Sequence, residues 1–269
     1  MIHDTRYMIL AAVFAGLAAS VKWTGITFLG VIGLIELGTL LSQGKPKKRI
    51  LNLALLTIIP FVLYFSIFAI HFSLLYKTGP GDAFMNERFR KTLQGSQDSK
   101  NPAIEPYSTW EKFIDLNKQM YLANARLTAG HPYSSTWYSW PFMTRPIYYW
   151  NDGMPQNAKI YLLGNPLVWW ASTFAIIYII LSGMVSSLMP SFQKTLKKDF
   201  ARYLIPFPWF FVLLAIAYIA NMLPFVGISR AMFLYHYFAG LLVAIIALAL
   251  VIDQVKNRRR SAIGFIVAT

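Results

Sequence analysis

The chain has 269 residues, of which 56% are hydrophobic and 13% are charged, and its mean hydropathy is +0.47. An average soluble domain is about one quarter charged, so this composition excludes an ordinary soluble domain and favours apolar helices that face lipid. The net charge of +14 does not indicate nucleic-acid binding, because the basic residues form short clusters beside apolar runs and no continuous basic stripe.

Five apolar blocks are long enough to cross a bilayer, which needs a helix of about 20 apolar residues. They cover residues 8–42, 50–75, 161–189, 203–225 and 231–252. The first block is longer than one span requires and is interrupted at Lys22. We therefore expect two short helices that turn near Lys22, with one long tilted helix as the alternative.

Three clusters, each with four basic residues, predict the topology, because cytoplasmic loops are rich in Lys and Arg. The clusters are Lys45–Arg49, Lys194–Arg202 and Lys256–Arg260. If the first cluster is cytoplasmic, the order of the helices brings the other two to the same side and leaves residues 76–160 external. The sequence thus predicts a multi-pass protein of the cell (plasma) membrane.

The external segment 76–160 begins with polar residues, 77–106, which we expect to be mobile. A helix over residues 108–128 follows, because Ser108 and Glu111 have the spacing of a capping box. Its face of large apolar residues either lies in the membrane interface or packs onto other parts of the loop. These residues are Trp110, Phe113, Ile114, Met120, Tyr121 and Leu127.

Residues 131–150 are rich in aromatic side chains and contain three prolines. One interpretation is an aromatic belt that anchors the loop at the bilayer surface. The other is the wall of a pocket, in which aromatic faces stack on a sugar ring and Arg145 binds a phosphate through paired hydrogen bonds. Residues 261–269, after the last basic cluster, turn apolar again, and we expect them to be the first turns of a further span that is cut off.

Four motifs, in order along the chain, resemble the protein O-mannosyltransferase family. They are Ser20-Val-Lys22-Trp23-Thr24-Gly25; His131-Pro-Tyr-Ser-Ser with Trp137-Tyr-Ser-Trp140-Pro141 and Arg145-Pro146-Ile; Tyr161-Leu-Leu-Gly164-Asn165-Pro166-Leu-Val-Trp169-Trp170; and Arg230-Ala-Met-Phe233-Leu-Tyr235-His236-Tyr237. The short external segment is similar to that of bacterial members, which lack an extra folded domain there.

The resemblance implies an all-α, polytopic integral membrane protein with a partial GT-C-type glycosyltransferase fold. Residues 1–75 would be middle transmembrane helices of the family. Residues 76–160 would be the external loop with its interfacial helix, and 161–269 a truncated C-terminal transmembrane region.

The activity that the resemblance implies is transfer of mannose from polyprenyl-phosphate mannose to Ser or Thr hydroxyls of exported proteins. Such a reaction needs a carboxylate to take the proton of the acceptor. In the family the acidic pair lies in the first external loop, which this chain does not include, so we expect no catalytic residue here and no activity from this chain alone. The lipid-linked sugar is a substrate, and no cofactor is implied. The histidines lack metal-ligand spacing, so no metal site is predicted.

The donor's phosphate needs cations to stabilise it as it departs. The candidate donor-binding residues are Lys22, Arg145, Arg230 and His236, with Trp137, Trp140 and Tyr235 for the sugar. Each cation has another interpretation. Lys22 and Arg230 could extend to lipid headgroups, His236 could be a hydrogen-bonded core residue, and Arg145 could bind backbone carbonyls. For Glu36 we expect a structural partner and no catalytic role.

Two other functions compete with this one. A transporter would also have broken helices and intramembrane charges, but the long aromatic loop and the absence of an internal repeat favour the transferase. A related lipid-linked sugar transferase with a lipid or glycan acceptor is the other alternative. Membrane lipid is an expected partner, whereas the acceptor proteins and the oligomeric state do not follow from the sequence.

Overall fold

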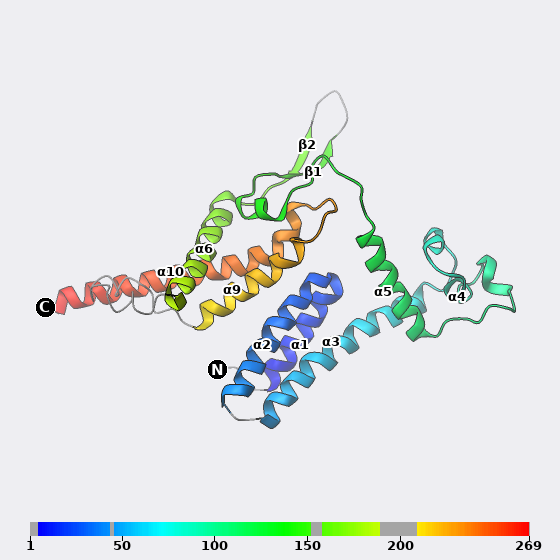
Figure 1. The fold of residues 1–269 in the computed structure, drawn as a ribbon, viewed down its shortest axis with the longest axis horizontal. Helices are drawn as coiled ribbons and strands as arrows, with labels where there is room; N and C mark the ends of the chain where they lie inside the picture. Colours follow the sequence, from blue (N-terminus) through cyan, green and yellow to red (C-terminus); the bar gives the residue numbers. More distant parts are fainter. Residues whose placement is uncertain (1–4, 44–45, 152–157, 189–208, 269) are drawn as a thin grey trace. The chain divides into compact units, whose positions relative to one another are not determined.

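The computed structural model describes residues 5–43, 46–151, 158–188 and 209–268, and these are mostly helical. The chain divides into two compact units, Met1–Thr128 and Ala129–Thr269 (Figure 1). Within the described residues, four helical segments are long and apolar enough to cross a membrane. They are Trp23–Ser42, Pro46–Leu74, Pro166–Met184 and Leu234–Lys256. The prediction of a multi-pass membrane protein is thereby confirmed, whereas the cluster Lys194–Arg202 lies outside the described residues.

The first apolar block forms two helices, as the interruption at Lys22 predicts. The elements are α1 (Thr5–Val21), the 3₁₀ turn η1 (Trp23–Gly25) and α2 (Ile26–Gln43). Lys22 has an extended backbone, with φ −156° and ψ 136°, which ends the helical path. A Cβ on Gly25 would lie 2.5 Å from the carbonyl carbon of Ala18, so the chain can turn back this closely only with glycine there. The alternative of one long tilted helix is wrong.

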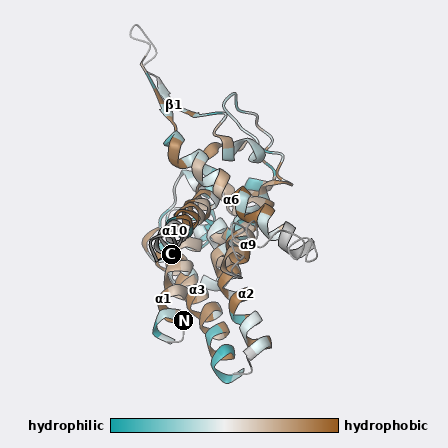
Figure 2. Ribbon diagram, turned by 90° about the vertical axis from the view of Figure 1, so that its left-hand side faces the viewer, coloured by the Kyte–Doolittle hydropathy of each residue, from teal (hydrophilic) through white to brown (hydrophobic). Residues whose placement is uncertain are grey.

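Small residues bring α1 against α3 (Pro46–Leu74). The buried face of α1 includes Ala12, Ala15, Gly16 and Ala19. A Cβ on Gly16 would lie 2.8 Å from the Cα of Pro60 in α3. Helices in membranes pack closely through such small residues, because lipid supplies no hydrophobic force between them. Figure 2 shows that α2 and α3 are mostly hydrophobic along their length, which suits surfaces that face lipid.

One buried polar cluster joins α2 to α3. The carboxylate of Glu36 accepts hydrogen bonds from Arg49 Nη1, at 2.9 Å for each oxygen, and from Asn52 Nδ2 at 3.0 Å. All three side chains are buried. Charged groups inside an apolar bundle are stable only when they are paired in this way. The expected structural partner of Glu36 is therefore Arg49.

The polar residues 77–106, which we expected to be mobile, form a folded segment of short helices. These are η2 (Pro80–Phe84), α4 (Glu87–Arg90) and η3 (Gln97–Lys100). Arg90 donates through Nε to Asp98 at 2.6 Å, and Ser96 Oγ donates to the carbonyl of Arg90 at 2.6 Å. Gly and Ser content alone favoured mobility, but these local hydrogen bonds fix the path of the chain.

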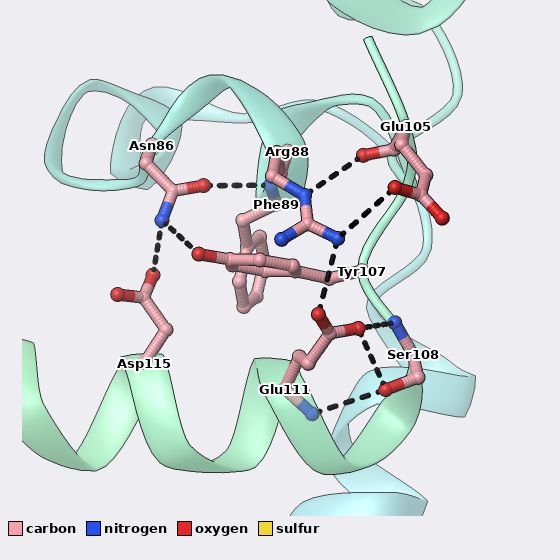
Figure 3. A network of polar contacts seen from close by, with 8 residues as sticks. All are labelled: Asn86, Arg88, Phe89, Glu105, Tyr107, Ser108, Glu111 and Asp115. Atoms are coloured by element: carbon pink, nitrogen blue, oxygen red, sulfur yellow. Dashed lines mark hydrogen bonds and ion pairs between the residues drawn. The ribbon is translucent and has the colours of Figure 1, made fainter.

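A second polar network ties this segment to helix α5 (Thr109–Ala125), as Figure 3 shows. Arg88 stacks on the ring of Tyr107 at 4.5 Å and donates to Glu111 at 3.0 Å. Asn86 donates to Tyr107 Oη at 2.9 Å and to Asp115 at 3.0 Å. The network therefore connects α4 with the first two turns of α5.

The predicted capping box begins α5. Ser108 Oγ accepts from the backbone N–H of Glu111 at 3.2 Å, and the Glu111 carboxylate accepts from the Ser108 N–H at 2.8 Å. The apolar face of the helix is divided. Phe113 is buried against the α3 rings of Phe65 and Phe68, whereas Ile114 and Tyr121 are exposed. Phe113 therefore packs onto another helix, which is one of the two predicted roles of this face. That the exposed residues lie in the membrane interface stays a prediction.

The second unit contains a β-hairpin that the sequence reading did not predict. Its strands are β1 (Ile147–Asn151) and β2 (Lys159–Leu162), which pair antiparallel with a bulge at Tyr148–Trp150. The strands are rich in Ile and aromatic residues, which favour extended pairing. The apolar block 161–189 therefore begins in a strand, and its helix starts only at Pro166.

Three helices complete this unit. They are α6 (Pro166–Leu188), α9 (Trp209–Met222) and α10 (Phe238–Ala268), with the 3₁₀ turns η4 (Trp137–Phe142), η5 (Leu223–Phe225) and η6 (Leu234–Tyr237). The backbone of α10 is helical without a break through residues 261–268. The basic cluster Lys256–Arg260 thus lies inside this helix, and the further span expected after it stays a prediction.

Candidate functional site

Residues 131–145 form a segment that we call the aromatic loop. Side chains of helix α6 donate hydrogen bonds to three consecutive carbonyl groups of this loop. Trp169 Nε1 donates to the carbonyl of Trp140 at 2.8 Å, and Trp170 Nε1 donates to that of Phe142 at 3.0 Å. Thr173 Oγ1 donates to the carbonyl of Pro141 at 2.7 Å. We call Trp169, Trp170 and Thr173 the carbonyl clamp. It supplies side-chain donors to three carbonyl groups of a short 3₁₀ turn that contains proline.

The turn after the clamped residues is equally constrained. Met143 has φ 53° in the left-handed region, where a residue other than glycine is uncommon. Its sulfur lies 3.2 Å from the backbone nitrogen of Gly164, which donates to it. A Cβ on Gly164 would lie 2.2 Å from the Trp169 ring, so glycine allows the chain to approach the clamp at this point.

The same loop packs on the segment that leads into α10. The backbone N–H of Ser135 donates to the carbonyl of Met232 at 2.8 Å. Trp140 stacks on His236, with ring centroids 5.8 Å apart and an interplanar angle of 13°. Trp140 Nε1 donates to Ser135 Oγ at 2.9 Å. The aromatic loop and the start of α10 therefore lie at the same end of this unit.

His236 is a buried residue between aromatic rings. It stacks on Tyr235, with centroids 4.4 Å apart, and meets Phe225 edge to face at 5.5 Å. Its Nδ1 accepts from the backbone N–H of Phe233 at 3.2 Å. This arrangement matches the interpretation of His236 as a hydrogen-bonded core residue that orders the entry to α10.

The two candidate arginines of this unit differ in their contacts. Arg145 is exposed and donates from Nη1 to the carbonyl of Ser134 at 3.1 Å. This bond uses one of the five donors of a guanidinium, so Arg145 both holds the loop and presents further N–H groups. Arg230 is half-buried, and its side chain forms no hydrogen bond or ion pair with any residue that the structure describes.

The three candidate aromatic residues are not equally accessible. Trp140 is 0% exposed, which makes it a core residue, and its ring has no surface on which a sugar could stack. Trp137 is half-buried and Tyr235 is 37% exposed, so both rings keep an accessible part. Aromatic content identified the loop, but it could not distinguish the ring that anchors the loop from those at its surface.

Lys22 belongs to the first unit, in the turn between α1 and α2. The neighbouring Trp23 donates through Nε1 to Tyr64 Oη at 2.9 Å. Tyr64 Oη in turn hydrogen-bonds Asn117 Oδ1 in α5 at 2.5 Å. The turn that carries Lys22 is thus at the same end of this unit as α5, and Arg49 is at the opposite end of α3.

An apolar cavity of about 290 Å³ lies between the start of α6 and the start of α10. Its walls include Leu163, Val168, Leu234, Phe238 and Leu241, with Asn165 as a polar residue. Leu234 is adjacent to Tyr235, so the cavity adjoins the segment that carries the candidate residues. The described residues contain no group of three or more His, Asp or Glu side chains that could hold a metal ion.

The carbonyl clamp is the functional feature that the sequence reading missed. The motif around Trp169-Trp170 was recognised as a similarity, but no role was assigned to it. The sequence does contain a signal for it. Trp169 and Trp170 are consecutive, and Thr173 follows about one helical turn later, so three side-chain donors lie close together on a helix with few other polar groups. Donors in such a helix must find acceptors, and a proline-containing loop offers them.

Comparison with known proteins gives consistent matches along the chain. Residues 109–269 match the family described as the C-terminal four TMM region of protein-O-mannosyltransferase, and residues 4–76 match dolichyl-phosphate-mannose-protein mannosyltransferase. Dolichyl-phosphate-mannose–protein mannosyltransferase 1 of Saccharomyces cerevisiae is 30% identical over 174 residues, which are 64% of this chain and 21% of that protein. Protein O-mannosyltransferase 1 of Drosophila melanogaster is 27% identical over 151 residues, 55% of this chain and 16% of that protein.

A solved structure has the same fold. The S. cerevisiae protein O-mannosyltransferase Pmt1-Pmt2 complex bound to the sugar donor matches with a TM-score of 0.78 and 18% identity, over 92% of this chain and 62% of the other. The chain thus spans about a fifth of the length of the curated relatives it matches.

Proposed function

The chain belongs to the protein O-mannosyltransferase family, and from this membership we propose that it forms the donor-binding part of a mannosyltransferase. The reaction is transfer of mannose from polyprenyl-phosphate mannose to Ser and Thr hydroxyls of exported proteins. Its curated relatives carry the name of this activity, and the solved relative was determined with its sugar donor.

One observation carries the proposal: the aromatic loop and the start of α10 are in direct contact. The Trp140–His236 stack and the bond from Ser135 to Met232 bring residues 131–145 and 230–237 to one end of the unit. This arrangement groups Arg145, Arg230 and Tyr235 at that end. A site assembled from two segments distant in sequence is what binding of a large donor requires.

The chemistry of these residues suits the departing group. Negative charge develops on the polyprenyl phosphate as the bond to the mannose breaks, and positioned cations stabilise it. We assign this role to Arg145 and Arg230, since a guanidinium can bind phosphate oxygens in pairs. The accessible parts of Trp137 and Tyr235 would contact the sugar, whereas Trp140 and His236 would hold the two segments together.

The apolar cavity between α6 and α10 would receive the first isoprene units of the donor. Its walls are apolar and it adjoins Tyr235 through Leu234. Burial of apolar surface stabilises such a chain by about 25 cal/mol per Å². Lys22 belongs to the first unit, and we do not assign it to this site.

The topology is part of the proposal. We place residues 76–160 outside the plasma membrane, with Lys45–Arg49, Lys194–Arg202 and Lys256–Arg260 in the cytoplasm. The positions of the Lys22 turn and of Arg49 at opposite ends of the first unit support this assignment. Because the chain has no cysteine, single-cysteine labelling can test it: Tyr138→Cys should react with an impermeant maleimide from outside, and Lys47→Cys only after permeabilisation. Cytoplasmic labelling of position 138 would remove the basis of the site.

The activity is tested in membranes that contain the complete enzyme, with lipid-linked mannose and a Ser/Thr-rich peptide. Arg145→Ala and Arg230→Ala should each lower transfer about tenfold or more, a change of roughly 1.4 kcal/mol in the barrier, with unchanged membrane insertion. Arg126→Ala, an exposed arginine in the first unit, is the matched control. Normal transfer in both variants would exclude the two arginines from the site.

The same assay separates the other functions. Uptake of a substrate without sugar transfer would support a transporter. Mannose found on a lipid or a glycan, with none on the peptide, would support a transferase with a non-protein acceptor. We expect no transfer by the purified 269-residue chain alone, because no acceptor base is assigned within it.

A further inference from the structure

A second cavity, in the first unit, lies apart from the residues assigned above. It has a volume of about 590 Å³ and is bounded by the end of α3 and by the folded segment 77–106. We propose that this cavity binds an anionic phospholipid, with the phosphate at His71 and Lys77 and an acyl chain along the apolar wall.

The apolar wall is built from buried side chains. Phe72, Phe89 and Leu93 line the cavity, and each is at most 7% exposed. They belong to one cluster with Phe113 of α5. Since three separate elements hold these rings, the wall is formed before any ligand binds, which lowers the entropy that binding must overcome.

The polar rim of the cavity contains one cation, one carboxylate and one imidazole. His71 and Lys77 line it, together with Asp82. The Asp82 carboxylate is already engaged, because it accepts from Thr78 Oγ1 and, at 3.1 Å, from the backbone N–H of Gly79. Lys77 forms no ion pair with any residue in the described part of the chain; its ammonium lies 5.7 Å from the Tyr76 ring. The Lys77 ammonium is therefore available to a phosphate, and the His71 ring can add a hydrogen bond to it.

The location of the cavity indicates a lipid. It lies at the end of Pro46–Leu74, a helix long and apolar enough to cross a membrane, and hence at the level of the headgroups. Leu74 and Leu75 line the cavity and are 69% and 60% exposed, so they continue the lipid-facing surface of α3 into it.

A peptide occupant is less well matched. An extended peptide would add to a free strand edge, through backbone hydrogen bonds. Here the backbone beside the rim is already paired, because Thr78 N donates to the carbonyl of Gln94 at 2.9 Å and Gln94 N donates to that of Tyr76 at 2.8 Å.

The test uses the purified chain in nanodiscs of phosphatidylcholine with a minor share of phosphatidylglycerol, and counts retained lipids by native mass spectrometry. Lys77→Gln removes the charge. Gly81→Leu fills the cavity, and a Cβ at Gly81 would meet no atom within 4 Å, so this variant should fold. Each should reduce retention of phosphatidylglycerol about fivefold.

Two matched controls make the same chemical changes elsewhere. Lys100→Gln alters an exposed lysine of the same segment, and Gly130→Leu adds a side chain at another glycine with open space. Both should retain phosphatidylglycerol like the unaltered chain. Equal retention in Lys77→Gln and Gly81→Leu would overturn the proposal. So would equally tight binding of soluble glycerol phosphate, or binding of a Ser/Thr-rich peptide that both variants abolish.

Discussion

The carboxylate of Glu36 and the guanidinium of Arg49 form an ion pair in which both side chains are at most 7% exposed. Arg49 belongs to the basic cluster that predicts the cytoplasmic side, but it does not extend into water. Arg49, which the topology prediction counts among the cytoplasmic charges, thus forms an ion pair between α3 and α2. The topology prediction at this cluster then depends on its three lysines, Lys45, Lys47 and Lys48.

Breaking this pair should destabilise the α2–α3 hairpin strongly. Glu36→Gln leaves the buried Arg49 charge without a counter-ion, and such changes cost about 3–5 kcal/mol. Replacement of both residues, Glu36→Leu with Arg49→Met, should cost much less, because no charge stays buried. Unfolding in mixed micelles, followed by circular dichroism, measures both. A double variant as unstable as Glu36→Gln would show that the pair is not the cause.

The tight turn before α2 should depend on its glycine. Gly25→Ala places a methyl group 2.5 Å from the Ala18 carbonyl carbon, so the turn must open and the melting temperature should fall. Gly33→Ala in α2 meets no atom within 4 Å and should be neutral or slightly stabilising, by about 0.5–1 kcal/mol. Equal melting temperatures for the two variants would contradict the proposed closeness of α1 and α2.

The start of α5 should respond to acid. Hydrogen bonds from the Ser108 backbone and hydroxyl, together with Arg88, lower the pKa of the Glu111 carboxyl below its ordinary value of 4.5. The unfolded chain therefore binds more protons in that range, and the stabilisation is present above pH 4.5 and lost as the pH falls through the lowered pKa. Amide exchange in the first turn of α5 should rise there, and Glu111→Gln should abolish the pH dependence. Ser108→Ala should return the pKa toward 4.5.

The carbonyl clamp should determine the order of the aromatic loop. Thr173→Val keeps the side-chain shape but leaves the Pro141 carbonyl without its donor, at a cost of about 1–3 kcal/mol. Amide exchange at Met143, whose N–H donates to Trp140, should become faster. Thr57→Val is the control, because the Thr57 hydroxyl donates to the carbonyl of Leu53 within its own helix. Unchanged exchange at Met143 would mean that the two tryptophans suffice.

Elements with a local cause could be predicted from the sequence. The break at Lys22 followed from a charged and polar interruption in an apolar block, and the start of α5 followed from the Ser108–Glu111 spacing. The side chains that meet across the chain could not be predicted. Nothing local to Glu36 identifies Arg49 as its partner, and nothing local to Pro141 identifies Thr173, because such pairs depend on how the helices pack.

Composition alone was a poor guide at three places in the fold. The polar segment 77–106 was expected to be mobile from its composition, yet ion pairs such as Arg90–Asp98 hold it. The strand that begins at Ile147 starts within the aromatic stretch 131–150, the strand at Lys159 lies beyond it, and a short hairpin gives little periodicity to detect. Trp140 was a candidate for sugar binding because its ring type fitted, but ring type carries no information on burial.

All three acceptors of the carbonyl clamp are main-chain oxygens. The backbone path of the loop therefore does not depend on which side chains the loop exposes. Tyr138 is exposed and makes no clamp contact, so evolution can exchange it without moving residues 140–142. A related protein could therefore carry another side chain at this position and keep the same loop backbone. The tryptophans and threonine of α6, by contrast, have little such freedom.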